Sequence, residues 1–237
     1  MAIKQANNIT LLGVGAATWQ PTLTGVTANN SLALIVVNTG GSASPTLPTD
    51  STGQTWTQTF NVTGGGNAFC SCQMYHLHGA NPGTHILSST TTATTYTFAS
   101  MVEFDACYAL DGVSPVATSG GASTSLAANT FTTTTATDAV FAIIGMNESG
   151  TGLANANFST PAGFTQFAVQ NATNTTEAGE FAYLTTSSAG AQNATWTYGA
   201  GGTTTTSYLA IIVGFKMNTA GAVVPNIIFV NMFGGDD

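Results

Sequence analysis

The stretch from Ser31 to Thr57 constrains the fold more than any other part of the chain. It begins with a continuous apolar run, Leu32 to Val37, and passes through a loop rich in Gly, Ser and Pro. A turn from Asp50 to Gly53 then delivers Trp56 to the next segment. Because Asp side chains hydrogen-bond to backbone in such turns, turn chemistry alone explains Asp50. The stretch predicts two strands joined by a loop, with Trp56 as an anchor.

The same plan returns about a hundred residues later, which is the scale of an internal duplication. Ala139 to Ile144 is the second apolar run, and Asn147 to Asn157 is the second loop. The turn runs from Thr160 to Gly163, and Phe164 stands where Trp56 stood. Two copies of one β unit predict a two-sheet β-sandwich with a shared core and with both aromatic side chains pointing inward.

The remaining chain is punctuated like an all-β protein, with short β-branched and aromatic runs between clusters of Gly, Pro, Asn and Asp. Frequent Gly, Thr and Asn disfavour helix. We expect one antiparallel β-sandwich domain at 1–217, with halves at roughly 22–115 and 130–217, and an arm at 218–237. The predicted strands are Ile9–Val14, Thr22–Val26, Ser31–Val37, Thr55–Val62, Ala68–Leu77, Thr84–Ser89, Val102–Leu110, Phe131–Thr135, Ala139–Ile144, Thr165–Gln170, Glu180–Thr185, Asn193–Tyr198 and Tyr208–Phe215.

Charged residues make up only 5% of the chain, whereas about 25% is usual. There are two Lys, no Arg and ten acidic residues, for a net charge of −8. This balance excludes a phosphate-binding patch for nucleic acid and attraction to an anionic membrane. A polar but nearly uncharged surface is typical of a protein packed among neighbours, where desolvating charge is costly, and of one that meets carbohydrate.

The first residues do not have the pattern of a signal peptide, and no apolar stretch approaches the length of a membrane span. We therefore expect synthesis in a host cytoplasm, with Cys70, Cys72 and Cys107 as reduced thiols. The Asn-X-Ser/Thr triplets are expected to be unglycosylated.

Alternation predicts which strand faces are buried. In Val102–Leu110, Phe104, Tyr108 and Leu110 are expected in the core, with Glu103 and Asp105 on the outer face. Leu32–Val37 and Ile211–Val213 are instead apolar at every position. Such strands are buried on both faces, or have one face covered by another subunit or by the terminal arms. We take them as a first indication of assembly.

Several of these segments together carry a family resemblance. In the first half, Thr49–Trp56 has the pattern Thr-Asp-x-x-Gly-x-Thr-Trp, and the acid-bearing segment that begins at Val102–Phe104 ends in Leu-Asp-Gly-Val at Leu110–Val113. In the second half, Pro161–Thr165 has the pattern Pro-x-Gly-aromatic-Thr. The order resembles β-sandwich proteins of bacteriophage virion modules and prophages, over most of Thr22–Phe215. The resemblance implies a jelly-roll-like sandwich on a virus particle, as a capsid decoration (cement) protein or in a tail or fibre. It brings no catalytic residues with it.

One strand carries five potential metal ligands on a single face, namely Cys70, Cys72, Met74, His76 and His78. Alternate residues on a strand stand ~6.6 Å apart, so one straight strand cannot place four of them around one ion. His76 and His78 would fill two positions only if His85 or an acid joined them. We predict no metal and no cofactor, and expect small, soft residues packed on a sheet face.

Catalytic patterns are equally weak. Glu103 and Asp105 lie two apart, whereas glycosidase carboxylates face each other ~5–9 Å apart across a cleft. No Gly-x-Ser-x-Gly elbow is present. Trp56 and Trp196 are expected as core anchors, and Trp19 as an exposed aromatic that contacts a sugar or a subunit. We predict a protein that is not an enzyme, with a polysaccharide hydrolase as the least favoured alternative.

The C-terminal arm differs from the chain before it, because it is apolar and follows a complete fold. An exposed apolar strand promotes aggregation, so the arm is covered either by its own sandwich or by a neighbouring subunit, and we predict the neighbouring subunit. The sequence thus favours a capsid decoration protein that forms a homo-oligomer, expected to be a trimer, on the major capsid protein of a virion. The alternative is a receptor- or glycan-binding module of a tail fibre that recognises a host surface glycan. The predicted arm residues are Val223, Val224, Ile227, Ile228, Phe229, Val230, Met232 and Phe233.

Overall fold

The computed structural model describes residues 3–11, 17–39, 46–63, 70–91, 96–121, 125–149, 157–170, 177–199 and 205–218. Every regular element in these ranges is a β-strand, and every strand pair is antiparallel. The predicted all-β fold is therefore confirmed. The described ranges contain no helix long and apolar enough to cross a membrane.

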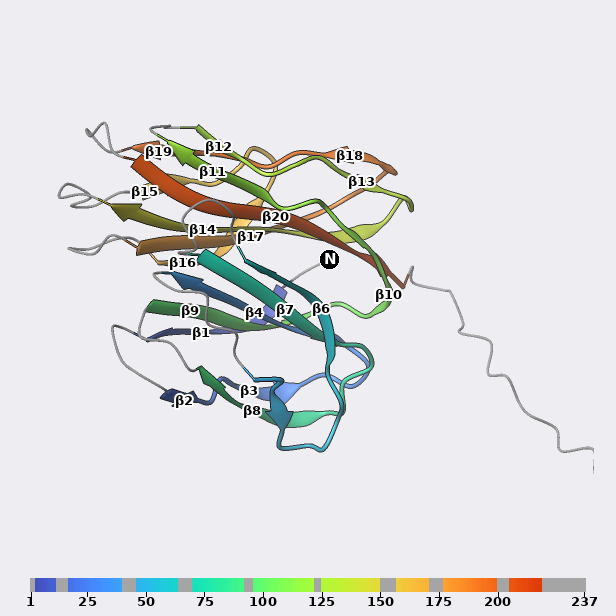
Figure 1. Cartoon of the computed structure of the whole chain (residues 1–237). Coiled ribbons are helices and arrows are strands. Elements are labelled where there is room, and N and C mark those ends of the chain that lie inside the picture. Colours follow the sequence, from blue (N-terminus) through green and yellow to red (C-terminus); the bar gives the residue numbers. More distant parts are fainter. Residues whose placement is uncertain are drawn as a thin grey trace, which may run out of the picture.

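Two large sheets lie at the centre of the molecule (Figure 1). The first has the strand order β1 (Ile3–Leu11), β9 (Tyr96–Phe104), β4 (Ser31–Thr39), β7 (Cys70–Leu77) and β6 (Thr57–Thr63). The second has the order β10 (Cys107–Val113), β20 (Thr205–Met217), β14 (Asp138–Ser149), β17 (Glu177–Thr185) and β16 (Thr165–Gln170), and β11 (Ala117–Gly121) also pairs with β20.

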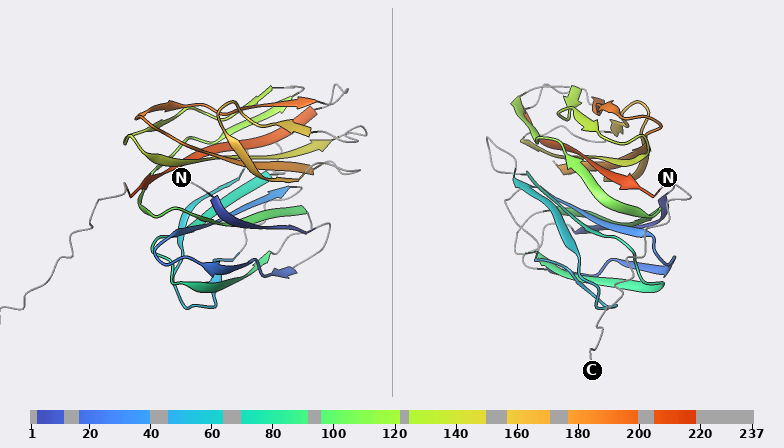
Figure 2. Two further views of the ribbon diagram at one scale, coloured as in Figure 1. Left: turned by 180° about the vertical axis from the view of Figure 1, so that it is seen from behind. Right: turned by 90° about the vertical axis from the view of Figure 1, so that its right-hand side faces the viewer.

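A layer of shorter strands lies on the outer side of each central sheet, and the views in Figure 2 show the same stacking. The layer on the first sheet consists of β2 (Ala17–Trp19), β3 (Thr22–Val26), β5 (Thr49–Asp50) and β8 (Gly83–Thr91). The layer on the second consists of β12 (Ser125–Ala127), β13 (Phe131–Thr133), β15 (Asn157–Ser159), β18 (Gly190–Gln192) and β19 (Thr195–Gly199).

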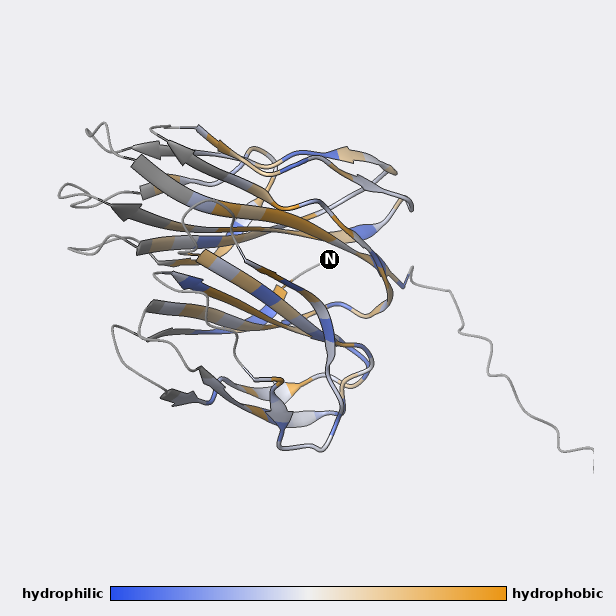
Figure 3. Cartoon of the chain, viewed as in Figure 1, coloured by the Kyte–Doolittle hydropathy of each residue, from blue (hydrophilic) through white to orange (hydrophobic). Residues whose placement is uncertain are grey.

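Apolar side chains fill three interfaces between these four layers, and the hydrophobic positions concentrate in the central strands (Figure 3). The middle interface joins the two central sheets through residues such as Ile35, Phe141 and Phe215. The outer interfaces bury Leu34 and Ile144 on the opposite faces of the same strands. The runs that are apolar at every position are thus covered on both faces by the chain's own strands. They no longer indicate a missing subunit.

The two central sheets are built to the same plan. Strand for strand, β4 corresponds to β14, β7 to β17 and β6 to β16 in the two orders. The pairing of β6 with β7 shifts register after Gln58, and that of β16 with β17 shifts after Gln166. These residues are spaced along the chain as Trp56 and Phe164 are. Because bulges are built-in features of a ladder, a shared bulge strongly supports a repeated unit.

The predicted aromatic positions follow this plan. Trp56 and Phe164 each directly precede the bulged strand of their half, and each packs with the outer interface of its own sheet. Trp56 is buried and Phe164 is half-buried. The preceding turns contain Gly53 at φ 74° and Gly163 at φ 84°, a backbone conformation that favours glycine.

The predicted strand Val102–Leu110 is wrong. Strand β9 ends at Phe104, and β10 begins at Cys107 in the other central sheet, so the chain crosses between the sheets at this point. The crossing reverses the alternation: Cys107 is buried, whereas Tyr108 is 55% and Leu110 37% exposed. The first sheet therefore spans Ile3 to Phe104, and β10, predicted within the first half, belongs to the second sheet.

Candidate functional site

The residues predicted to make contacts are not confirmed as a site. All eight arm residues lie outside the described ranges. The prediction that Trp19 is exposed is wrong, because it is only 3% exposed. Strand β2 pairs Trp19 with Ser89 of β8, and the indole packs in the interface that also holds Trp56. A buried Trp19 cannot serve as a platform for a sugar.

The acidic pair of the predicted strand is split by the chain crossing. Glu103 is 1% exposed instead of facing solvent, and its carboxylate ties β9 to neighbouring segments. Burial would raise the pKa of Glu103, but the hydrogen bonds it accepts outweigh this and lower it. Asp105 instead pairs with Lys4, with 2.7 Å between Oδ1 and Nζ. The donors to Glu103 are Gln5 Nε2 at 2.6 Å, Asn30 Nδ2 at 2.7 Å and the Thr27 amide at 2.9 Å.

The Cys/His face of β7 lies in the middle interface. Cys70, Cys72 and Met74 are buried there among the aromatic side chains. Burial raises the pKa of Cys72, and it raises the pKa of Cys107 to about 12. Thiols held this firmly in the protonated form are poor nucleophiles and poor metal ligands. The face packs as expected for small, soft residues.

His76 and His78 lie at the end of the same face, with 4.7 Å between ring centroids, and both rings contact Phe215. His76 Nδ1 lies 2.7 Å from the Thr59 hydroxyl. Burial and the neighbouring His78 lower the pKa of His76 to about 4, and burial also lowers the pKa of His78. Both rings are therefore neutral at pH 7. His85 does not join them, and no group of three or more metal-ligating side chains occurs in the described ranges.

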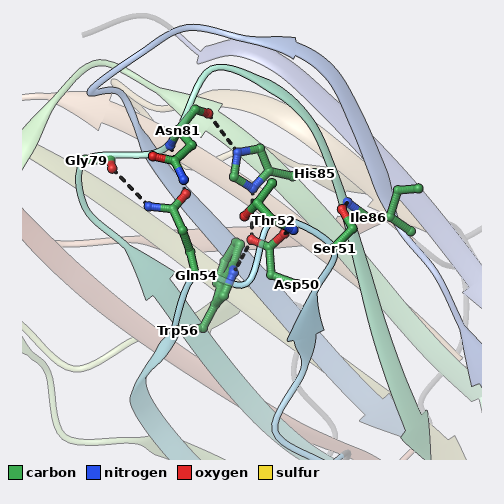
Figure 4. A network of polar contacts seen from close by, with 9 residues as sticks. All are labelled: Asp50, Ser51, Thr52, Gln54, Trp56, Gly79, Asn81, His85 and Ile86. Carbon is green, nitrogen blue, oxygen red and sulfur yellow. Dashed lines mark hydrogen bonds and ion pairs between the residues drawn. The ribbon is translucent and has the colours of Figure 1, made fainter.

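The most extensive polar cluster surrounds Asp50, between the turn that precedes Trp56 and strand β8 (Figure 4). Asp50 Oδ1 accepts from the Thr52 amide at 2.9 Å, which confirms the predicted turn chemistry. Asp50 Oδ2 accepts from Trp56 Nε1 at 2.9 Å and lies 2.8 Å from His85 Nδ1. Both the Asp50 and His85 side chains are 0% exposed. One carboxylate thus joins a turn, a core aromatic and a strand of the outer layer.

This Asp–His pair is not arranged as a catalytic base. His85 Nε2 lies 2.9 Å from the Asn81 carbonyl oxygen, on the side away from Asp50. A carboxylate and a carbonyl oxygen only accept hydrogen bonds, so each ring nitrogen of His85 faces an acceptor of the chain itself. Neither ring nitrogen faces an open position where a substrate or a metal could bind. No local pattern predicts this cluster, because His85 lies 35 residues along the chain from Asp50.

A second buried cluster joins the layers of the other half. Glu180 of β17 is 0% exposed and accepts from Trp196 Nε1 at 3.2 Å and from Gln166 Nε2 at 2.9 Å. Burial raises the pKa of Glu180, and its neutral donors only partly offset this. Trp196 is 0% exposed, so its predicted place in the core is confirmed.

Most of the acidic side chains whose burial the structure describes lie in such buried clusters and not on the surface. Of the six acidic residues whose burial the structure describes, only Asp105 has an appreciably exposed side chain. The other five are hydrogen-bonded within the chain, and they are Asp50, Glu103, Asp111, Asp138 and Glu180. The described exterior is therefore almost entirely uncharged.

The exposed apolar side chains offer a candidate contact surface. Tyr108 and Leu110 are both exposed on β10, which is an edge strand of the second sheet. Strand β20 ends beside them, since Met217 pairs with Cys107 and the Asn218 amide donates to the Ala106 carbonyl at 3.0 Å. The predicted arm therefore leaves the described structure next to this edge. The two other large apolar residues exposed in the described ranges are Leu47 and Ile86.

Comparisons with known proteins found no match: no protein-family model, no curated protein and no solved structure resembles this chain.

Proposed function

We propose that the chain is a non-enzymatic structural protein of a bacteriophage particle, most simply a capsid decoration or cement protein. The observation that carries the proposal is that five of the six acidic side chains whose burial the structure describes lie in the interior. The buried carboxylates strengthen the chain's own layers, and the exterior keeps polar groups that are inexpensive to desolvate. Such a surface suits a subunit surrounded by close neighbours.

The strand order of each half supports the same proposal. In the first half, β1-β9-β4-β7 form one sheet, and β3 and β5 flank β8 in the facing layer. This order supports a jelly-roll-like arrangement, an architecture found in viral capsid and lectin domains, although β6 pairs with β7 in the first sheet. We propose that each half is a jelly-roll-like unit. Fold alone does not determine function, so the order adds weight only together with the uncharged exterior.

The arm is the proposed means of assembly. Described strands already cover both faces of both central sheets, so these faces do not need the arm to cover them. We propose that Val223–Phe233 adds as a strand to a neighbouring subunit in a homo-oligomer, expected to be a trimer. Burying side chains such as Ile227 and Phe229 would contribute on the order of 1.5–3 kcal/mol each.

Truncation after Asn218 tests this proposal. We expect the shortened chain to remain folded and soluble, to sediment as a monomer and to be lost from purified particles, whereas the full chain sediments as an oligomer. A control with Ile227, Phe229 and Val230 changed to Ser keeps the length of the arm and removes its apolar surface. If truncation unfolds the domain while the full chain is a monomer, the arm belongs to its own core and the proposal fails.

A receptor- or glycan-binding module of a tail fibre is the alternative. One observation favours it: Tyr108 is 55% exposed on an uncharged surface, as a sugar-stacking aromatic would be. In this case Tyr108→Ala abolishes retention of the protein on host-cell polysaccharide and leaves sedimentation unchanged. A decoration protein gives no retention with either form.

A further inference from the structure

Two carboxyl groups of the second half meet inside the molecule. Asp111 lies on β10 and Asp138 at the start of β14, on either side of β20. Both side chains are 0% exposed. Consecutive residues of one turn hold the two carboxyl groups, because Thr134 donates to Asp111 and Thr135 donates to Asp138. Lys216 of β20 pairs with Asp138 in the ladder, and its Nζ lies 3.3 Å from Asp111 Oδ1.

The donors around this pair are unevenly distributed. Asp111 Oδ2 accepts from the Thr134 amide at 2.8 Å, and Asp111 Oδ1 accepts from the Thr134 hydroxyl as well as from Lys216. Asp138 Oδ1 accepts from the Thr135 hydroxyl. Asp138 Oδ2 is buried and has no hydrogen-bond partner. A buried carboxylate oxygen without a donor is costly, so this oxygen calls for an explanation.

The charges around the pair do not balance if both carboxyl groups are ionised. The one cation that faces them is Lys216, which lies closer to Asp111. The segment after β17 contributes only the Thr186 hydroxyl, which accepts from the Asp138 amide at 2.9 Å. The start of β10 contributes the Cys107 thiol, and Asp105 lies beyond it. Two anions and one ammonium would leave this buried group with a net negative charge, and no hydrogen-bond donor would offset that charge at Asp138 Oδ2.

We propose that Asp138 carries a proton on Oδ2 and donates it to Asp111, so that the pair acts as a proton-operated clamp. The proton satisfies the unpartnered oxygen and leaves Asp111 as the anion paired with Lys216. The clamp holds the Thr134–Thr135 turn, which leads from β13 into β14, against the second central sheet. It does not depend on the proposed function.

The electrostatics of the two groups agree with this assignment. Burial, together with the negative charge of Asp111, raises the pKa of Asp138. Burial acts the same way on Asp111, but hydrogen bonds from Thr134 and the Lys216 ammonium outweigh it and lower its pKa. Carboxyl groups that share one proton separate in this way. Because the folded-state pKa of Asp138 is raised, its contribution is complete below the unfolded pKa and is lost as pH rises through the folded value.

The test is the pH dependence of Asp138→Asn, which keeps the shape of the side chain and replaces the proton with an amide donor. At pH 8 we expect the variant to melt at or above the parent protein, by up to about 2–4 °C. The difference should shrink as pH falls through the raised pKa of Asp138, because the parent then takes up its own proton. The matched control is Asp105→Asn, the same change at the partly exposed partner of Lys4. The difference in melting temperature between Asp105→Asn and the parent should not shrink as pH falls.

A second readout covers the case in which the variant does not fold. The carboxyl carbon of Asp138, followed by NMR in the parent protein, should titrate above the usual range for Asp, and Asp111→Asn should remove this shift. The proposal is overturned if Asp138 titrates in its usual range, or if Asp138→Asn melts below the parent at every pH. It is also overturned if calcium raises the melting temperature of the parent but not of Asp138→Asn, since the pair would then hold a cation.

Discussion

The two halves of the molecule share a backbone plan but join their layers by different chemistry. In the first half, Trp56 donates to a carboxylate that also contacts an imidazole ring. In the second, Phe164 stands at the corresponding place and has no polar atom to offer. At the shared bulge, Thr59 contacts His76, whereas Phe167 packs against Tyr183 at a ring-centroid distance of 6.2 Å.

This comparison distinguishes the features that determine the shared strand arrangement from those that differ between the two halves. The apolar runs and the bulge recur in both halves, so they determine which strands pair and which faces are buried. The buried acids differ in their surroundings: the pKa values of Asp50, Glu103 and Asp111 are lowered, whereas those of Asp138 and Glu180 are raised. Both acids with a raised pKa lie in the second half. We therefore expect a lower pH to weaken the links at Asp50, Glu103 and Asp111 and to strengthen those at Asp138 and Glu180.

The largest expected difference between the halves is at the paired aromatic positions. Trp56→Ala should lower the free energy of unfolding by about 3–5 kcal/mol, because it opens a cavity in the core and leaves Asp50 without a donor. Phe164→Ala should cost about half as much, since Phe164 is only half-buried. Urea denaturation of both variants measures the two costs. Equal costs would show that the half-buried ring is as important to the core as the fully buried one.

Asp50→Asn should cost about 3 kcal/mol at pH 7, because it leaves His85 buried without its charged partner. Burial opposes ionisation of Asp50, but hydrogen bonds from Thr52, Trp56 and His85 outweigh it and lower its pKa. The contribution is therefore complete above the unfolded pKa and is lost as pH falls through the folded value. Urea midpoints from pH 7 to pH 3 should show the variant approaching the parent. If the difference in urea midpoint between Asp50→Asn and the parent instead widens towards pH 3, the pKa of Asp50 is raised in the folded protein and not lowered.

Close packing between the halves can be tested at Gly145. A Cβ added there would lie 2.3 Å from Val37 Cγ1, across the interface between the central sheets. Gly145→Ala should therefore destabilise the protein by about 1–3 kcal/mol through overpacking. Adding Val37→Ala should recover part of this cost, and the double-mutant cycle measures the coupling. Strictly additive costs would mean that the sheets separate slightly instead of interlocking at this point.

The smallest expected effect is that of Glu180→Gln, and its sign is the informative result. Burial raises the pKa of Glu180, so its contribution to stability is lost as pH rises through the folded value. The amide should leave stability unchanged or raise it by up to about 1 kcal/mol at pH 8, because it removes a buried charge that has no cation beside it. Thermal melts at pH 8 and pH 5 provide the comparison. If Glu180→Gln is clearly less stable than the parent at pH 8, the ionised form of Glu180 stabilises the protein as that of Asp50 does, and the two acids do not differ in the way described.

Much of the fold could be predicted because it depends on local patterns. The apolar runs at Leu32 and Ala139, the turn at Asp50 and the matched positions of Trp56 and Phe164 all lie within single supersecondary units. The crossing after Phe104 could not be predicted, because neither Asp105 nor Ala106 is a Gly or a Pro that would mark a strand end. The alternation of apolar and polar residues also continues through both positions.

The separate outer layers were not predicted, although their strands β3, β8, β13 and β19 overlap predicted strands. Short strands such as β2, β5 and β12 have only two or three residues, too few to show a period. Without these layers, apolar runs on both faces of a strand were interpreted as contacts with another subunit, and Trp19 as exposed. The pairing of Asp50 with His85 depends on strand β8 passing over the turn, and nothing local to either residue indicates it.

The central claim is that this chain is an abundant structural component of a virus particle. The most direct measurement is its copy number in purified virions, relative to the major capsid protein, by quantitative mass spectrometry. The account predicts a number close to that of the capsid protein, with loss of the chain truncated after Asn218. A few copies per particle, or absence from the virion, would contradict it.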